Sequence, residues 1–393
     1  MKSFDIKTKI YFGDNALDRL ADLPYKKALI ITDPFVVKSG MLQMITYRLN
    51  DGYTEFDVFS DVVPDPPIEK ISLGVKAMLD YDPDVVIAIG GGSAIDSAKS
   101  IREFATRASQ KEVALIAIPT TSGTGSEVTS FAVISDKSKN MKYPLADYEL
   151  TPDVAIIDPE FVYTVPKAST AFTGLDVLTH AIEAYVSVLA NDYTDALALH
   201  AIKLVFKYLP TSYATADPEA REKMHNASCI AGMAFTNAFL GVNHSLAHKL
   251  GGEFHIPHGL ANAYLLPHVI EYNGEPTPTK FAAWPKYDHY IAPERYAEIA
   301  KMMGFVPQNA TAQEGVKALA DAVRKLMTDV GIPLSIKEAG ENDKRSYIEP
   351  KVFEDALDDL AYKAFDDQCT TANPRLPRID ELKKLYMLAY YGK

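Results

Sequence analysis

The sequence predicts two parts of different class: an α/β part over residues 1–167 and an all-helical part over residues 168–393. In the first part, short β-branched runs end in turn residues and alternate with helical stretches. This alternation is typical of a parallel sheet with helices on both faces. After about residue 168 these runs stop and long helical periodicities follow. We therefore place a domain boundary near residues 166–170.

Each predicted element rests on its own run of residues. Strands are predicted over the apolar runs 27–34, 84–92, 113–121 and 153–159, and a helix over 93–105. Helices of the second part are predicted over 172–189, 193–208, 217–238, 258–272, 292–304, 313–330, 352–365 and 378–391. The Pro-rich, aromatic segment 273–291 is predicted to be a long loop.

Composition excludes several classes of protein. The 393 residues are 47% hydrophobic and 23% charged, as in an ordinary globular protein. A net charge of −12 argues against a nucleic-acid or anionic-membrane partner. Cys229 and Cys369 form no CxxC pair, so neither a disulfide scaffold nor a thiolate zinc site is expected. The N-terminus lacks the apolar core of a signal peptide, and the uncharged stretch 225–248 holds too many polar groups for a membrane span. We expect a cytoplasmic protein.

A glycine-rich turn, IAIGGGSAIDSAK, occupies residues 87–99. A strand, three glycines and a helix start present free backbone N–H groups and the positive end of a helix dipole, which together bind phosphate. Ser93 is expected to cap this helix. The GxGxxG pattern is incomplete, because Gly90 and Gly92 fit but Ile95 stands where the third glycine belongs. A tight turn without a ligand is the alternative.

A second loop, PTTSGTGSEVT at residues 119–129, follows the next predicted strand. Hydroxyls and glycines at the carboxyl end of a strand suit ligand binding in an open α/β sheet, and two such loops favour a dinucleotide. Asp33, at the end of the first apolar run, is placed to accept hydrogen bonds from an adenosine ribose. Its charge would repel a 2′-phosphate and so favour NAD over NADP. The alternative is that Asp33 only begins the TDPF turn.

Histidines gather in the segment NHSLAHKLGGEFHIPHG, residues 243–259, which holds four of the nine in the chain. His244 and His248 lie four residues apart, and so do Asp176 and His180 in an earlier predicted helix. Side chains at this spacing share one face of a helix and can reach one ion.

A helix break is expected between these histidines and the last of the segment. Gly251 and Gly252 should end one helix and Pro257 should open the next, which lets His258 turn back toward the preceding helix. The oxygen and nitrogen donors then suit Fe(II), Zn(II) or Mn(II). Spacing alone does not choose four ligands from the five candidates, His255 competes with them, and buried structural histidines are the alternative.

Four motifs in this order resemble the iron-containing (group III) alcohol dehydrogenases over nearly the whole length: IAIGGGSAIDSAK, IPTTSGTGSEVT, TGLDVLTHAIEAY and NHSLAHKLGGEFHIPHGLANA. The last motif, with PTKFAAWPKY, RYAEIA and the segment 364–393, is most similar to the alcohol dehydrogenase half of bifunctional aldehyde/alcohol dehydrogenases. The resemblance implies a free-standing module with a Rossmann-like parallel sheet and a helical domain, the dehydroquinate synthase-like fold.

The resemblance also implies roles for particular residues. It places the metal on Asp176, His180, His244 and His258, and makes His248 a candidate proton relay. The implied nucleotide contacts are Asp33, Asp65, Gly91, Gly92, Ser93, Thr120, Thr121, Thr129 and Lys142.

The activity that the resemblance implies is NAD(H)-dependent interconversion of short-chain aldehydes and primary alcohols, with Fe(II) or else Zn(II). Reduction of acetaldehyde, propionaldehyde or butyraldehyde in fermentation is expected, by a homodimer or larger homo-oligomer, free in the cytoplasm or inside a bacterial microcompartment. Four alternatives stay open: a glycerol- or propanediol-type polyol dehydrogenase, a zinc lyase similar to dehydroquinate synthase, a metallohydrolase, and a non-catalytic scaffold. A metallohydrolase would leave both glycine loops without a purpose.

Overall fold

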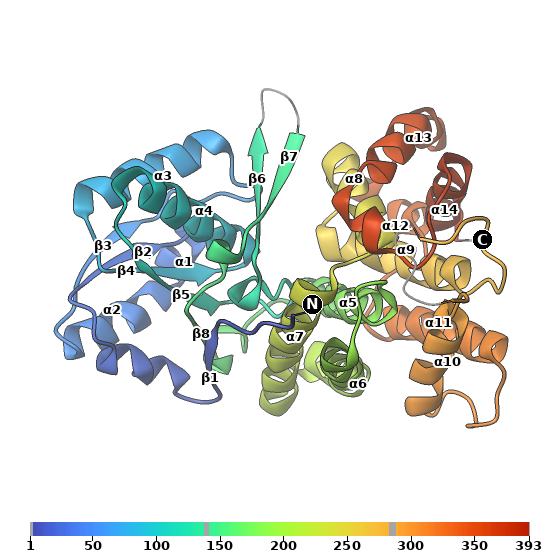
Figure 1. Cartoon of the computed structure of the whole chain (residues 1–393), viewed down its shortest axis with the longest axis horizontal. Coiled ribbons are helices and arrows are strands. Elements are labelled where there is room, and N and C mark those ends of the chain that lie inside the picture. The colour runs from blue at the N-terminus through green and yellow to red at the C-terminus, as the bar shows by residue number, and fades with distance from the viewer. Residues whose placement is uncertain (1–2, 137–140, 283–287, 393) are drawn as a thin grey trace. The chain divides into compact units, whose positions relative to one another are not determined.

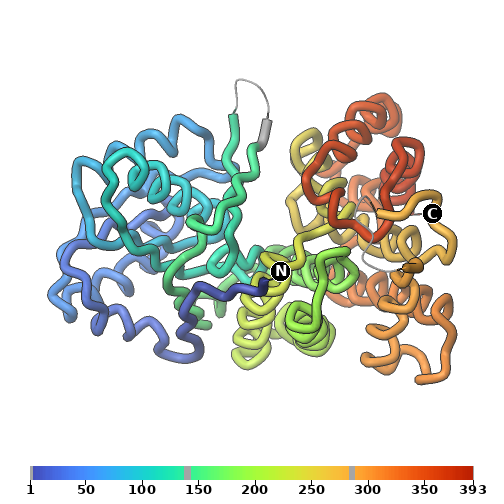
Figure 2. Tube along the Cα trace, viewed as in Figure 1, coloured from blue at the N-terminus to red at the C-terminus, as the bar shows by residue number. Residues whose placement is uncertain are grey.

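The computed structural model describes residues 3–136, 141–282 and 288–392. By its internal contacts the chain divides into two compact units (Figures 1 and 2). Unit 1 consists of Met1–Val165 with Asp217–Thr236, and unit 2 of Pro166–Ala216 with Asn237–Lys393. The chain leaves unit 1 beside the predicted boundary, but the return of residues 217–236 to unit 1 had no signal in the sequence.

Unit 1 is built on a sheet that is parallel, as predicted; it has six strands in the order β1-β8-β5-β4-β2-β3. Its strands are β1 (Lys9–Phe12), β2 (Lys27–Ile31), β3 (Glu55–Phe59), β4 (Val85–Gly90), β5 (Ala114–Pro119) and β8 (Val154–Ile157). The central strand β4 is buried along its whole length, because helices cover both faces of the sheet. The edge strands β1 and β3 were not predicted, since both carry exposed residues and so lack a continuous apolar run.

Alternate residues of the central strands pack into two separate cores. Val86 and Ala88 of β4 join α3 (Ile68–Tyr81) and α4 (Gly92–Ser109) on one face. On the other face Ile87 packs with helices that include α1 (Pro34–Ser39) and α2 (Met41–Asp51). Beside the sheet lie α7 (Pro218–Ala238) and an antiparallel hairpin, β6 (Phe131–Asp136) and β7 (Met141–Ala146), which was not predicted.

Unit 2 is helical. Its helices are α5 (Lys167–Val186), α6 (Asp192–Thr215), α8 (Val242–Phe254), α9 (His258–Asn273), α10 (Ala292–Met302), α11 (Ala312–Asp329), α12 (Ile336–Asn342), α13 (Pro350–Phe365) and α14 (Ile379–Tyr391). The apolar α5 is buried over most of its length, because it packs against α6 and α9. Among the described residues, no helix is both long enough and apolar enough to cross a membrane.

Two local predictions differ from the structure. Helix α8 does not end at Gly251 and Gly252 but runs on to Phe254, and His255 terminates it in a left-handed conformation with φ 55°. Packing against α9 and α13 stabilises this last turn in spite of the glycines. The predicted loop 273–291 corresponds to the segment between α9 and α10, of which residues 283–287 lie outside the described structure.

Candidate metal centre and nucleotide loops

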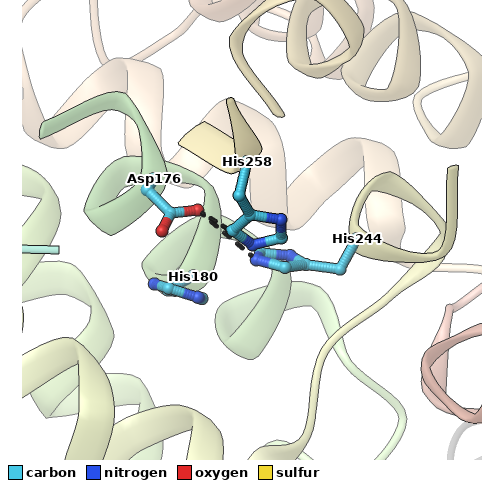
Figure 3. Close-up of side chains that lie close together, drawn as sticks. All are labelled: Asp176, His180, His244 and His258. Carbon is cyan, nitrogen blue, oxygen red and sulfur yellow. Dashed lines mark ion pairs between the residues drawn. The ribbon is translucent and has the colours of Figure 1, made fainter. Parts of the chain in front are cut away.

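Four of the predicted ligands lie together in unit 2 (Figure 3). Asp176 and His180 project from one face of α5, His244 comes from the first turn of α8, and His258 opens α9. One donor atom of each residue lies within 4.8 Å of those of the other three. Three helices therefore supply one carboxylate and three imidazoles to a single point.

The charges at this point favour a bound cation. Asp176 Oδ1 lies 3.7 Å from His244 Nε2 and 3.5 Å from His258 Nε2, and the carboxylate is buried. Burial alone would raise the pKa of Asp176, but the charges of His180 and His258 and hydrogen bonding with His244 hold it well below its usual range. An ionised carboxylate surrounded by imidazole nitrogens fits a divalent metal such as Fe(II) or Zn(II).

Glu183 orients one of the imidazoles and was not predicted. Its Oε2 lies 2.5 Å from His244 Nδ1, and its Oε1 accepts a 2.7 Å hydrogen bond from the backbone N–H of Asn243. Burial would lower the pKa of His244, but Glu183 and Asp176 outweigh it and raise this pKa to about 9. A carboxylate on the far nitrogen is the usual partner of a metal-bound histidine. The sequence could have indicated this residue, because Glu183 lies seven residues after Asp176 on α5, which is two helical turns and so the same face of the helix.

Asn262 is a second unpredicted residue, one turn after His258 on α9. Its side-chain amide donates a 2.7 Å hydrogen bond to Asp176 Oδ1, and the same nitrogen lies 3.2 Å from Nε2 of both His244 and His258. The amide oxygen in turn accepts a 2.9 Å hydrogen bond from Asn243. Asn262 thus holds the ligands from all three helices close together.

His248 lies outside this group of four. Its Nδ1 lies 3.0 Å from Asp367 Oδ2, which also accepts a 2.7 Å hydrogen bond from Lys249. The His248 ring stacks on His258 with centroids 5.4 Å apart. The structure therefore separates the fifth candidate from the other four while keeping it beside them. His255 is exposed and belongs to neither histidine group of the described structure.

A glycine lets α9 reach the metal group. A Cβ atom at Gly259 would lie 2.1 Å from the carbonyl oxygen of Phe172 on α5. No side chain fits this contact, so glycine after His258 brings the start of α9 directly onto α5. The close approach places His258 over Asp176.

The glycine-rich turn of unit 1 has the predicted strand–turn–helix geometry. Gly90 has φ +148°, Gly91 precedes the first turn of α4, and Gly92 is its first residue. Ser93 is not the cap that was predicted, because the helix begins one residue earlier and Ser93 lies inside its first turn. Thr120 at the end of β5 donates its backbone N–H to the carbonyl of Gly90 at 2.9 Å.

Asp33 follows the end of β2, and Asp65 lies in the loop between β3 and α3. One oxygen of Asp33 caps α1 by accepting from the backbone N–H groups of Phe35 and Val36, at 2.7 and 3.1 Å. The other oxygen lies 3.2 Å from the Cβ position of Gly90, beside the glycine turn. Both interpretations of Asp33, the turn and the nucleotide contact, fit this placement. Asp65 is exposed, has φ 50°, and accepts a hydrogen bond from Ser135 through its carbonyl at 2.7 Å.

The remaining predicted nucleotide residues belong to the second loop and the hairpin. Thr121 contacts Gly91: a Cβ atom added at Gly91 would lie 3.4 Å from the methyl group of Thr121. Thr129 is buried, and its hydroxyl and carbonyl accept hydrogen bonds from Lys99 at 3.1 and 2.8 Å. Lys142 pairs with Ser135 in the hairpin, and its side chain lies outside the described structure.

Comparison with known proteins yields two family matches. The profile of the Fe-containing alcohol dehydrogenase family, C-terminal, matches residues 170–390, and that of iron-containing alcohol dehydrogenase matches residues 7–159. An aldehyde-alcohol dehydrogenase of Streptococcus pneumoniae is 46% identical over 100% of this chain and 46% of its own length. The chain thus spans about half the length of that relative.

A second relative and a solved structure match along their full length. The 1-propanol dehydrogenase PduQ of Citrobacter freundii is 44% identical over 98% of this chain and 99% of its own. The structure of sulfoacetaldehyde reductase from Bifidobacterium kashiwanohense in complex with NAD+ is 29% identical, with a TM-score of 0.84 over 100% of both chains.

Proposed function

The chain belongs to the iron-containing alcohol dehydrogenase family, and we propose that it interconverts short-chain aldehydes and primary alcohols with NAD(H) and a divalent metal. The metal is Fe(II), with Zn(II) as the substitute that the same donors accept. The observation that carries the proposal is the convergence of Asp176, His180, His244 and His258 within 4.8 Å of one another.

Two further observations support NAD. Asp33 places a carboxylate beside the glycine turn, where it would repel the 2′-phosphate of NADP. The sulfoacetaldehyde reductase that shares this fold binds NAD+. The residues Asp65, Gly91, Gly92, Ser93, Thr120, Thr121, Thr129 and Lys142 complete the proposed nucleotide contacts.

The chemistry divides between the bound groups and the chain. A divalent ion held by the four ligands would act as a Lewis acid on the substrate oxygen, and a nicotinamide would exchange hydride with the substrate carbon. Asp176 supplies the negative charge that offsets the cation, while Glu183 holds His244 in one tautomer and orientation.

His248 is the proposed proton carrier. Alcohol oxidation releases one proton in addition to the hydride, and aldehyde reduction takes one up. The carboxylate of Asp367 lies 3.0 Å from His248 Nδ1 and so fixes the ring, and an imidazole is a side chain that can both take up and release a proton.

The partners that we propose are small-molecule substrates and further copies of the same chain. The negative charge of the chain disfavours nucleic acid. A cytoplasmic homodimer or larger homo-oligomer, free or packaged in a microcompartment, is proposed from the resemblance of the sequence.

One anaerobic experiment tests the function. The purified protein is stripped with a chelator, Fe(II) or Zn(II) is restored separately, and NADH consumption is followed with acetaldehyde, propionaldehyde and butyraldehyde. Activity restored by Fe(II) is the expected result. NADH binding without turnover of any aldehyde would contradict the substrate class, and turnover of glycerol or propanediol would make the chain a polyol dehydrogenase.

A further inference from the structure

Helix α7 presents one face to the second loop, residues 119–129, and to Ser130 directly after it, within unit 1. His225, Cys229, Gly232 and Thr236 lie at spacings of four, three and four residues, so they share this face of the helix. The local sequence of the loop does not predict this contact, because α7 lies about a hundred residues further along the chain.

The two ends of the loop are hydrogen-bonded to α7. Near its start, Ser122 Oγ lies 3.1 Å from His225 Nδ1. At its end, the backbone N–H of Ser130 donates a 3.1 Å hydrogen bond to the hydroxyl of Thr236. Both positions of the loop are therefore set by side chains of one helix.

Between these ends, the loop and the helix touch backbone to backbone. A Cβ atom at Gly232 would lie 2.8 Å from the carbonyl oxygen of Gly125 and 3.0 Å from its Cα atom. A Cβ atom at Gly125 would lie 2.7 Å from Gly232 Cα, and φ +61° at Gly125 adds a second reason for glycine. Only a pair of glycines allows this approach.

The opposite side of the loop is held by α4, which begins at the first glycine turn. Lys99 donates to the carbonyl oxygens of Thr129 and Phe131, at 2.8 and 2.7 Å. Asp96 accepts a 2.6 Å hydrogen bond from the hydroxyl of Ser126. The loop is thus fixed between two helices, one from each of the two chain segments that make up unit 1.

His225 is suited to orient a hydroxyl rather than to carry charge. Its side chain is 1% exposed, and burial lowers its pKa to about 4, so the ring is neutral at physiological pH. A neutral imidazole beside Ser122 fixes the direction of the hydroxyl without adding charge to a site for phosphate.

We propose that α7 is the positioning element of the dinucleotide loop, and that His225 and Gly232 are positioning residues that act through Ser122 and Gly125 without touching the nucleotide. This inference rests on the proposed function, because it takes the loop to bind NAD(H). It predicts that changes on α7 weaken cofactor binding while the metal affinity of unit 2 stays the same.

The test compares variants of the full chain with matched controls. His225→Leu removes the partner of Ser122, His225→Asn keeps a hydrogen-bonding group there, and Gly232→Ala inserts a Cβ into the glycine contact. The control His268→Leu removes another buried histidine, and Gly315→Ala crowds a helix contact of unit 2, where its Cβ would lie 2.4 Å from Ala297 Cβ.

The measurements are the NADH dissociation constant by titration of metal-free protein, metal affinity, melting temperature and the steady-state constants. We expect His225→Leu and Gly232→Ala to raise the dissociation constant and KM for NADH about tenfold, the size of one lost hydrogen bond or one shifted contact, with kcat at saturating NADH within about twofold. His225→Asn should bind nearly as well as wild type, and both controls should keep wild-type NADH affinity even if they lower the melting temperature.

Ser122→Ala completes the test as a double-mutant cycle with His225→Leu. If His225 acts through Ser122, the second substitution adds little to the first. Wild-type affinity in both His225→Leu and Gly232→Ala, additive effects in the cycle, or equal loss in the unit 2 controls would overturn the inference. Failure of the wild-type protein to bind NADH would instead overturn the proposed function, and the inference with it.

Discussion

The proposed metal group of unit 2 and the proposed nucleotide loops of unit 1 are built from different kinds of atoms. The metal group uses side-chain donors on regular helices, where Asp176, His180, His244 and His258 converge. The nucleotide loops use glycine turns, backbone N–H groups and hydroxyls at the carboxyl ends of strands. A site made of side chains on helices can be recognised in the sequence from the spacing of its residues. A site made of backbone groups depends instead on the tertiary contacts that hold the loop in one conformation.

Both sites nevertheless need a glycine where two elements meet. Gly259 brings α9 onto α5 in unit 2, and Gly232 brings α7 onto the second loop in unit 1. Neither glycine is part of the chemistry. The two sites therefore differ in the atoms that would bind the ligand, but both are assembled through a glycine at a close contact between two elements.

Loss of a metal ligand should separate the two sites most sharply. We expect His258→Ala to lower metal affinity at least about a hundredfold and to abolish activity, because one of four donors is gone. NADH affinity of the metal-free protein should not change. The exposed neighbour His255→Ala is the control and should keep its metal. The metal content of each variant is measured after dialysis. A wild-type metal content in His258→Ala would refute the assignment of His258 as a ligand.

Removal of His248, the proposed proton carrier, should affect turnover and leave metal binding unchanged. His248→Ala is expected to lower kcat about a hundredfold, within the range of lost acid–base catalysis. Asp367→Asn should lower it by less, because the ring remains but loses the charge that fixes it. Both variants are assayed for kcat and metal occupancy. If metal occupancy fell more than kcat, His248 would be a ligand instead.

A weaker change should follow from the partner of His244. Glu183→Gln keeps the shape of the side chain but removes the charge at His244 Nδ1, and such partners affect metal affinity about 10–100-fold. Competition with a chelator of known affinity measures the change. Glu271→Gln, a partly exposed glutamate of α9, provides the control. Equal metal affinity in Glu183→Gln and wild type would mean that packing alone orients His244.

In unit 1, Asp33 allows the charge and the helix cap to be tested separately. Asp33→Gly and Asp33→Asn should each raise the ratio of NADP to NAD efficiency about tenfold, because both remove the charge that repels a 2′-phosphate. Only the glycine variant loses the α1 cap, which costs it a few tenths of a kcal/mol of stability. Steady-state kinetics with both cofactors measures the ratio, and an unchanged preference in both variants would leave Asp33 as a turn residue alone.

The last prediction concerns stability rather than activity, through the buried carboxyl group of Glu127 in the second loop. Burial raises the pKa of Glu127 from 4.5 to about 7, so the folded chain holds this proton more tightly than the unfolded chain. Stability is therefore expected to fall as pH rises from about 4.5 to about 7 and to stay lower above that range. Glu127→Gln should remove this loss and stabilise the chain at pH 8 relative to pH 5 by about 1–3 kcal/mol.

Thermal unfolding at both pH values checks this prediction. The exposed Glu160→Gln should show no such pH-dependent difference from wild type. A pH-independent effect of Glu127→Gln would mean that the carboxylate is held ionised beside Lys99 throughout.

The sequence by itself determined the class of each unit and the kinds of atoms at each site. Continuous apolar runs mark the central strands because a sheet covered on both faces buries every residue, whereas the edge strands β1 and β3 mix exposed and buried positions and were missed. Likewise, the i and i+4 spacing on α5 and α8 placed pairs of donors on one helix face.

Residue spacing left open which candidates meet, and the tertiary structure brings together the four that the family resemblance named. His248 and His244 share a helix face, yet packing turns one toward Asp367 and the other toward Asp176 and Glu183. The return of α7 to unit 1 and the place of Asn262 were equally invisible, because spacing along one helix says nothing of the distance between helices. That distance is set by packing contacts such as those at Gly259 and Gly232, where the absence of a side chain allows two backbones to touch.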